Sequence, residues 1–182
     1  MKIQPMTLEN APLSVRSYFS DSTGPLVGTL AQVPELLQRT MPFLGQQFGQ
    51  SALSMRHKEM IILGVSVLQG CIYCTQTHTV LAHQEGLSLG ELQALHGKMD
   101  STVFLGKESV LWSYVLAMGA DVVDSNRVSL AMDRLKEEWL DFEIVEITML
   151  IGTTIMLNRY CIALEIPTSE SHLVWLQEQG WS

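Results

Sequence analysis

Proline is concentrated at the beginning of this sequence and is then absent from residue 43 to residue 166. The six prolines are Pro5, Pro12, Pro25, Pro34, Pro42 and Pro167. Proline interrupts α-helices because it lacks a backbone N–H and its ring clashes with the preceding turn. The proline-free stretch also contains no Asn-Gly or Asp-Gly hairpin turn and no sustained alternation of apolar and polar residues. We therefore predict an all-α fold, a single-domain helical bundle.

Apolar residues at helical spacing, together with capping residues, mark the individual helices. Ser54 and Ser88 are suited to begin two of them, and Ser125 or Asn126 is suited to begin a third. Pro42 is expected to kink or split the first helix. The predicted helices cover residues 34–48, 55–69, 71–85, 89–96, 107–118, 126–138, 141–164 and 169–179.

The same patterns divide the chain into three segments. We expect a proline-rich N-terminal arm at residues 1–52 whose helical segments pack on the core, a helical core at 53–166 and a C-terminal helical tail at 167–182. Within the core, a shift of 87 residues pairs Glu59 with Glu146 and Cys74 with Cys161. This echo suggests an internal duplication of a helical hairpin.

The charge of the chain argues against one class of partner. Nineteen acidic residues against 11 basic ones give a net charge of −8 and a pI near 5.0. Such a surface repels phosphate backbones, so we expect no nucleic-acid partner. The apolar stretches are shorter than the about 20 residues of a membrane span, and the N-terminus lacks the apolar core of a signal peptide. We expect a soluble, cytoplasmic protein without a membrane partner.

Two of the three cysteines, Cys71 and Cys74, form a CxxC pair, and three cysteines are too few for a disulfide scaffold. On a helix, Cys71, Cys74 and His78 fall within about 60° of one another. A helix N-terminus stabilises a thiolate, and a second sulfur three residues away can resolve a sulfenic acid or a mixed disulfide. His78 can accept a proton, and Glu59 can orient it if the chain turns back at Gly70. These residues predict a cysteine-based catalytic site.

Two other interpretations of the pair stay open. The cysteines can be two small buried residues without chemistry. Alternatively, Cys71, Cys74 and His78 can bind zinc, with Cys161 or Glu59 as the fourth ligand. Structural zinc sites usually draw their ligands from two separated pairs, however, and the sequence has no second CxxC or CxxH. We therefore expect no metal and no cofactor.

The spacing Glu59–x11–Cys71–x2–Cys74–x3–His78 resembles the alkylhydroperoxidase D (AhpD)-like, carboxymuconolactone decarboxylase superfamily. The resemblance extends over about residues 53–166. It includes the segments Leu53-Ser-Met-Arg-His-Lys-Glu59, Ala82-His-Gln-Glu-Gly-Leu-Ser88 and Phe142-Glu-Ile-Val-Glu146, and the pair Asn158-Arg159.

This resemblance implies an all-helical fold that assembles into homo-oligomers, commonly trimers or hexamers. Members with the cysteine pair act as thiol-dependent peroxidases or as disulfide reductases that serve peroxiredoxins. By matching positions, Cys74 is the attacking cysteine, Cys71 is the resolving cysteine and proton donor, and His78 and Glu59 form a proton relay. One position departs from the peroxidase pattern, because Tyr73 stands where that enzyme has histidine.

We therefore expect a thiol-dependent peroxidase or thiol–disulfide oxidoreductase that reduces a small hydroperoxide or a partner disulfide. A peroxiredoxin or a thiol reductant is the expected partner. The alternatives are a carboxymuconolactone decarboxylase-like lyase acting on a small cyclic acid and a non-enzymatic, metal-stabilised helical oligomer.

Large aromatic residues also bear on assembly. Six of them occupy helical positions without an obvious inner neighbour: Trp112, Tyr114, Trp139, Phe142, Trp175 and Trp181. Because monomers rarely expose a large apolar patch, we expect a homo-oligomer (dimer, trimer or hexamer) to which residues 139–181 contribute an interface. The alternative is that these aromatics pack the bundle itself.

Overall fold

The computed structural model describes residues 1–20, 24–97 and 101–181. The parts of the predicted arm, core and tail at residues 21–23, 98–100 and 182 therefore lie outside the described residues. Throughout the described ranges the regular structure is helical and no strand occurs, which confirms the all-α prediction. The elements are η1 (Leu13–Tyr18), α1 (Pro25–Leu30), α2 (Pro34–Phe48), α3 (Met55–Gln69), α4 (Ile72–Gln84), α5 (Leu89–His96), η2 (Ser101–Val103), α6 (Lys107–Met118), α7 (Ser125–Glu138), α8 (Asp141–Leu164) and α9 (Glu170–Glu178).

The helices begin and end close to the predicted residues, with three differences. Pro42 lies inside α2, which continues through it as one helix. The N-cap of α7 is Asp124, whose side chain accepts from the N–H groups of Asn126 and Arg127, so the prediction of Ser125 or Asn126 was wrong. No bounds were predicted for the short helices η1, α1 and η2, because a single turn or two has little apolar periodicity.

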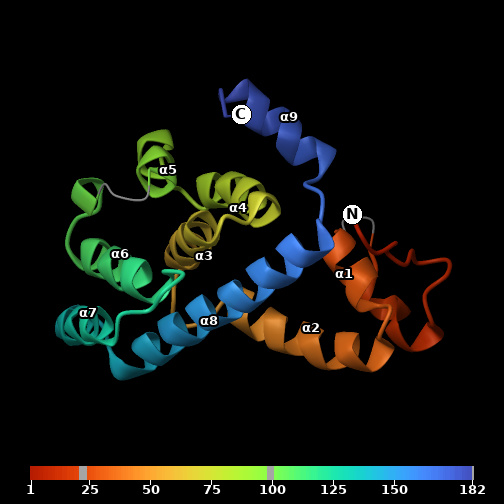
Figure 1. The fold of residues 1–182 in the computed structure, drawn as a ribbon, viewed down its shortest axis with the longest axis horizontal. Helices are drawn as coiled ribbons and strands as arrows, with labels where there is room; N and C mark the ends of the chain where they lie inside the picture. Colours follow the sequence, from red (N-terminus) through yellow and green to blue (C-terminus); the bar gives the residue numbers. More distant parts are fainter. Residues whose placement is uncertain (21–23, 98–100, 182) are drawn as a thin grey trace.

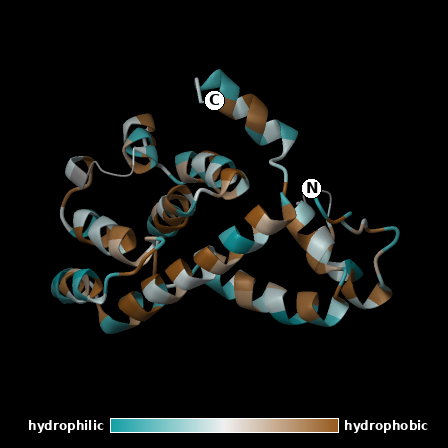
Figure 2. Cartoon of the chain, in the orientation of Figure 1, coloured by the Kyte–Doolittle hydropathy of each residue, from teal (hydrophilic) through white to brown (hydrophobic). Residues whose placement is uncertain are grey.

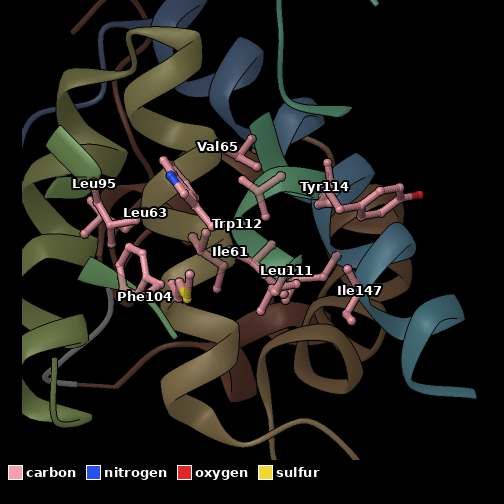
Figure 3. Close-up of a cluster of buried hydrophobic side chains, with 14 of the residues drawn as sticks. Ile61, Leu63, Val65, Leu95, Phe104, Leu111, Trp112, Tyr114 and Ile147 are labelled. Carbon is pink, nitrogen blue, oxygen red and sulfur yellow. The ribbon is translucent and has the colours of Figure 1, made fainter. Parts of the chain in front are cut away.

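The centre of the bundle is formed by α3 and α8, which lie side by side (Figure 1). Helices α4 and α6 also pack on α3, and α7 packs on α6. Figure 3 shows Trp112 and Leu111 of α6 against Ile61 and Leu63 of α3. A Cβ at Gly64 would lie 2.4 Å from Cζ3 of Trp112, so this glycine permits the close approach of α6 to α3.

Polar contacts also join the central helices. Lys58 of α3 is fully buried, and its Nζ donates to the carbonyl oxygens of Gln47 and Gly49 at 2.8 and 2.7 Å. The same Nζ lies 2.8 Å from Oε1 of Glu146 on α8. A buried ammonium is tolerated only with such partners. Lys58 thereby ties the end of α2 and the first half of α8 to α3.

The two segments that a shift of 87 residues aligns have different structures. The first copy is broken into α3 and α4 at Gly70, which adopts the left-handed conformation with φ of 69°. The matching position in the second copy is Leu157, which lies within the continuous helix α8. The echo is therefore not a duplicated hairpin, because Leu157 continues the helix where Gly70 ends it.

The bundle itself buries half of the six aromatics that were expected to lack an inner neighbour. Trp112, Tyr114 and Trp139 are in the core. Trp175 and Trp181 are partly buried against the rings of His83 and His96. Among the six aromatics only Phe142, on α8, is exposed, so these residues alone do not require an oligomer.

The first 50 residues have a small apolar cluster of their own, formed by η1, α1 and α2. In Figure 1 these elements extend from the bundle beyond one end of α8. The hydroxyl of Tyr160 on α8 donates to Oγ1 of Thr29 at 3.0 Å, which links α1 to the end of α8. The N-terminal arm thus contacts the bundle near the C-terminal end of α8.

Helix α8 is the one described helix that is long and apolar enough to cross a membrane by length and composition. Apolar residues recur along its whole length (Figure 2). Ile147, Leu150 and Ile151 are nonetheless buried in the protein core, and α3 packs against the helix. These contacts identify α8 as the central helix of the bundle.

Candidate functional site

The turn at Gly70 places the cysteine pair. The N–H of Cys71 donates to the carbonyl of Ser66 at 3.1 Å, which closes the end of α3 around the left-handed glycine. The chain then reverses, and α4 packs back along α3. Cys71 becomes the N-cap of α4, and Cys74 lies in the first turn of that helix.

The two sulfurs of the pair are in direct contact. Sγ of Cys71 lies 2.7 Å from Sγ of Cys74 and accepts the backbone N–H of Cys74 at 3.4 Å. Both side chains are buried, and both thiols are free. A disulfide needs an S–S distance of about 2.05 Å, so a small movement is enough to join them.

Cys161 on α8 completes a group of three thiols, which we call the thiol cluster (Cys71, Cys74 and Cys161). Cys161 packs with both other cysteines in one buried cluster. Hydrogen bonds with Cys161 and Cys74 lower the pKa of Cys71 to about 3. The hydrogen bond with Cys71 raises the pKa of Cys161 to about 12, and the bonds with Cys161 and Cys71 raise the pKa of Cys74. The negative charge of the cluster therefore resides on Cys71 at the helix N-terminus, where backbone N–H groups favour it.

Glu59 and His78 form the second part of the site. Oε2 of Glu59, on α3, lies 2.8 Å from Nδ1 of His78, on α4. Glu59 is only 5% exposed. Because a carboxylate accepts hydrogen bonds, Nδ1 donates, and Nε2 is left to take or give a proton.

Two cavities meet at the thiol cluster. The first, which we call the His78 cavity, has a volume of about 360 Å³ and is lined by Glu59, Cys74, His78, Asn158 and Cys161 together with mostly apolar residues. The second, which we call the Cys71 cavity, has a volume of about 400 Å³ and is lined by Cys71, Tyr73 and Cys161 with residues near the end of α8.

A few side chains separate the His78 cavity from the Cys71 cavity. Cys74 lines the His78 cavity and Cys71 lines the other, whereas Tyr73 and Cys161 line both. Burial, and then the neighbouring thiols, raise the pKa of Tyr73 to about 12, so its hydroxyl stays neutral. The cysteine pair thus connects two separate spaces.

The structure brings all four predicted site residues together. Glu59, Cys74 and His78 line one cavity, and the sulfur of Cys71 touches that of Cys74. Sequence reasoning considered Cys161 only as a zinc ligand and placed no role on Asn158. The echo that aligns Cys161 with Cys74 was the one available signal.

Asn158 contributes an unused hydrogen-bond donor to the His78 cavity. Its side chain is fully buried, and its Oδ1 accepts from Oγ of Ser66 at 3.2 Å. Among the residues that the structure describes, its Nδ2 has no hydrogen-bond partner. Because buried donors are rarely left unpaired, this amide is suited to hold an oxygen atom of a ligand.

The arrangement does not support the zinc interpretation. Two thiolates on a tetrahedral zinc ion are about 3.8 Å apart, since each Zn–S bond is about 2.3 Å. The sulfurs of Cys71 and Cys74 are 2.7 Å apart. Among the residues that the structure describes, no group of three or more His, Cys, Asp and Glu side chains is arranged to hold a metal ion.

Comparison with known families and structures agrees with the geometry. The sequence model of the carboxymuconolactone decarboxylase family matches residues 34–117, a range that contains Glu59, Cys71, Cys74 and His78. No curated protein matches the sequence.

Several solved structures are similar over most of their length. A protein of unknown function from Agrobacterium tumefaciens, described as a candidate antioxidant-defence protein AhpD, is 25% identical, with a TM-score of 0.70 over 78% of this chain and 95% of that one. An uncharacterised peroxidase-related protein with an AhpD core, from Ralstonia eutropha, is 14% identical, with a TM-score of 0.76 over 94% of this chain and 93% of that one. A cysteine-to-alanine variant of the debrominase Bmp8 in complex with 2,3,4-tribromopyrrole is 16% identical, with a TM-score of 0.78 over 98% of this chain and 97% of that one.

The similarity to the Ralstonia protein and to Bmp8 concerns the fold alone, whereas the similarity to the Agrobacterium protein extends to the sequence. With the family match and the spacing of the four site residues, they lead to one assignment. Residues 34–117 match the carboxymuconolactone decarboxylase family, and the chain as a whole has the fold of AhpD-like proteins.

Proposed function

We propose that the protein is a cytoplasmic thiol-dependent peroxidase, a cysteine-based oxidoreductase that reduces small hydroperoxides through Cys74 and Cys71. The observation that carries this proposal is the contact of the two sulfurs at 2.7 Å beside a cavity that also contains the Glu59–His78 pair. A nucleophile, a resolving thiol and a proton relay are thereby assembled at one place.

His78 supplies the base for the first step, while Cys71 keeps its resting negative charge. Nε2 of His78 takes the proton of the Cys74 thiol, and the Cys74 thiolate attacks the terminal oxygen of the hydroperoxide. The O–O bond breaks, Cys74 becomes a sulfenic acid, and Nε2 of His78 returns the proton to the departing alkoxide. Attack from the His78 cavity is supported by the position of Cys74, which lines it.

The second step closes the disulfide. The Cys71 thiolate attacks the sulfenic sulfur, and the hydroxide that leaves takes one proton and becomes water. Since the cysteine pair starts with a single proton, this second proton comes from solvent. We assign its delivery to Nε2 of His78, which Glu59 holds in place. A dithiol reductant or a peroxiredoxin partner then exchanges with the disulfide.

The lining of the His78 cavity favours a neutral substrate. It contains the carboxyl groups of Glu59 and Glu85 and, among its described lining residues, no lysine or arginine. A cyclic carboxylic acid would meet like charge there, which disfavours the lyase alternative. Apolar side chains make up much of the remaining wall, including Leu26, Phe48 and Ile62. Small organic hydroperoxides fit this surface.

The test is stopped-flow consumption of cumene hydroperoxide with dithiothreitol as reductant. We expect Cys74→Ser to lose peroxidase activity and to show no oxidation of residue 74. Ala163→Ser is the matched control, because it introduces a serine at an exposed position of α8. We expect this variant to keep the parent rate. Equal consumption by the parent and Cys74→Ser would show the proposal to be wrong.

A further inference from the structure

The proposed reaction uses two of the three thiols, and the third lies in contact with both. Cys161 is 3% exposed and packs in one buried cluster with Cys71 and Cys74. It comes from α8, whereas the pair comes from the beginning of α4. All three cysteines of the sequence are thus gathered in one cluster, although Cys161 is 87 residues from Cys74.

The cavities give Cys161 a second property. Cys71 lines only the Cys71 cavity and Cys74 only the His78 cavity, but Cys161 lines both. A thiol in this position reaches the sulfur of Cys74 from the substrate side and the sulfur of Cys71 from the other side. It is therefore placed to react with whichever of the two is oxidised.

We propose that Cys161 is a third redox-active thiol, which acts as a second resolving cysteine and forms a disulfide with Cys74. The inference rests on the proposed function, because the sulfenic acid of Cys74 is what Cys161 resolves. The Cys161 thiol gives its proton to the leaving hydroxide as its sulfur attacks the sulfenic sulfur of Cys74. One S–S bond forms, the S–O bond breaks and water leaves, so no further oxidant is needed.

This route matters when Cys71 is occupied. An external thiol bound to Cys71 in the Cys71 cavity removes the first resolving cysteine but leaves Cys161 beside Cys74. The Cys74 sulfenic acid is then still converted to a disulfide, which protects it from further oxidation to a sulfinic acid. The Cys74–Cys161 disulfide is reduced by exchange with an external dithiol, like any protein disulfide.

The experiment compares Cys71→Ser with Cys71→Ser/Cys161→Ser after one equivalent of hydrogen peroxide. Dimedone traps sulfenic acid, and peptide mass spectrometry without reduction identifies disulfides. We expect Cys71→Ser to yield the peptide pair joined through Cys74 and Cys161, with little dimedone adduct. The double variant is expected to carry at least tenfold more adduct on Cys74. Cys161→Ser alone is the matched control and keeps the Cys71–Cys74 disulfide.

The outcomes separate this inference from the proposed function. Equal dimedone labelling of the two variants, or a disulfide between two molecules in place of the internal one, overturns the role of Cys161. If peroxide leaves Cys74 unoxidised in every variant, the proposed function is wrong. Diamide oxidation of Cys71→Ser then decides the inference: an internal Cys74–Cys161 disulfide supports it, and its absence overturns it. Circular dichroism of each variant verifies folding.

Discussion

Nδ1 of His78 lies 2.8 Å from Oε2 of Glu59, although the two residues are 19 positions apart and belong to different helices. The contact exists because the chain reverses at Gly70 and lays α4 against α3. It fixes which ring nitrogen of His78 holds its proton, and so which one remains for chemistry.

Replacement of this carboxyl tests the relay. We expect Glu59→Gln to lower the rate of Cys74 oxidation by about 100-fold, because an amide holds the imidazole but does not stabilise its protonated form. Stopped-flow kinetics with cumene hydroperoxide measures this rate. Glu137→Gln, an exposed change on α7, serves as the comparison. A Glu59→Gln rate within twofold of the parent would argue against a relay through His78.

The charge on Cys71 predicts an unusual pH profile. Its pKa of about 3 lies below the ordinary value, so the thiolate is present above that pH and is lost only as the pH falls through about 3. Alkylation of Cys71 by iodoacetamide should therefore be nearly constant from about pH 5 to about pH 8, where an ordinary thiol speeds up about tenfold per unit.

Cys161→Ala should shift this profile to higher pH, because the hydrogen bond with Cys161 is the largest cause of the lowered pKa. Cys161→Ser retains a donor and should shift it less. Site-resolved alkylation measured by mass spectrometry gives both profiles. If the alkylation rate of Cys71 in the parent rises steadily with pH, the negative charge of the thiol cluster does not reside on Cys71.

The free amide of Asn158 predicts an effect on substrate binding. Asn158→Leu removes the unpaired Nδ2 donor from the His78 cavity, and we expect KM for cumene hydroperoxide to rise up to about tenfold with a smaller change in kcat. Thr153→Val is the comparison, because Thr153 is also buried and unpaired but does not line this cavity. Equal KM values for Asn158→Leu and Thr153→Val would remove Asn158 from the binding surface.

Gly64 predicts a loss of stability outside the site. Gly64→Ala places a methyl group against the ring of Trp112 and should lower the free energy of unfolding by about 1–3 kcal/mol. Gly45→Ala, where the added Cβ meets no described atom within 4 Å apart from its chain neighbours and the nearby backbone of its own helix, should instead leave stability unchanged or raise it slightly. Urea unfolding followed by circular dichroism measures both, and equal midpoints would contradict the packing of α6 on α3.

The exposed face of α8 predicts self-association. Phe142, Val145, Met149 and Met156 are all at least half exposed, and their spacing of three, four and seven residues aligns them along one side of the helix. We expect light scattering after size exclusion to give a multiple of 20.3 kDa for the parent. Met149→Glu should reduce that mass, whereas Val122→Glu, an exposed change before α7, should not. A parent mass near 20.3 kDa would overturn this expectation.

Local signals were sufficient for much of the fold. Ser54 and Ser88 begin α3 and α5 as predicted, because an N-cap depends on a side chain and the N–H groups a few residues later. The pairing of Glu59 with His78 followed from the glycine between their helices. The approach of Cys161 to Cys74 could not be predicted, because it depends on how α8 lies against α4. The burial of Trp112 likewise depends on the space that Gly64 leaves across the α3–α6 contact.

The division of the thiol cluster between two cavities has a kinetic consequence. In the reaction that we propose, a hydroperoxide reaches Cys74 through the His78 cavity, which Cys74 lines, and a reducing thiol reaches Cys71 through the Cys71 cavity, which Cys71 lines. The oxidising and the reducing substrate therefore occupy different places on the molecule, and an excess of one does not displace the other. Turnover in such an arrangement rises with both concentrations to a common ceiling, free of the mutual competition that a single shared entrance imposes.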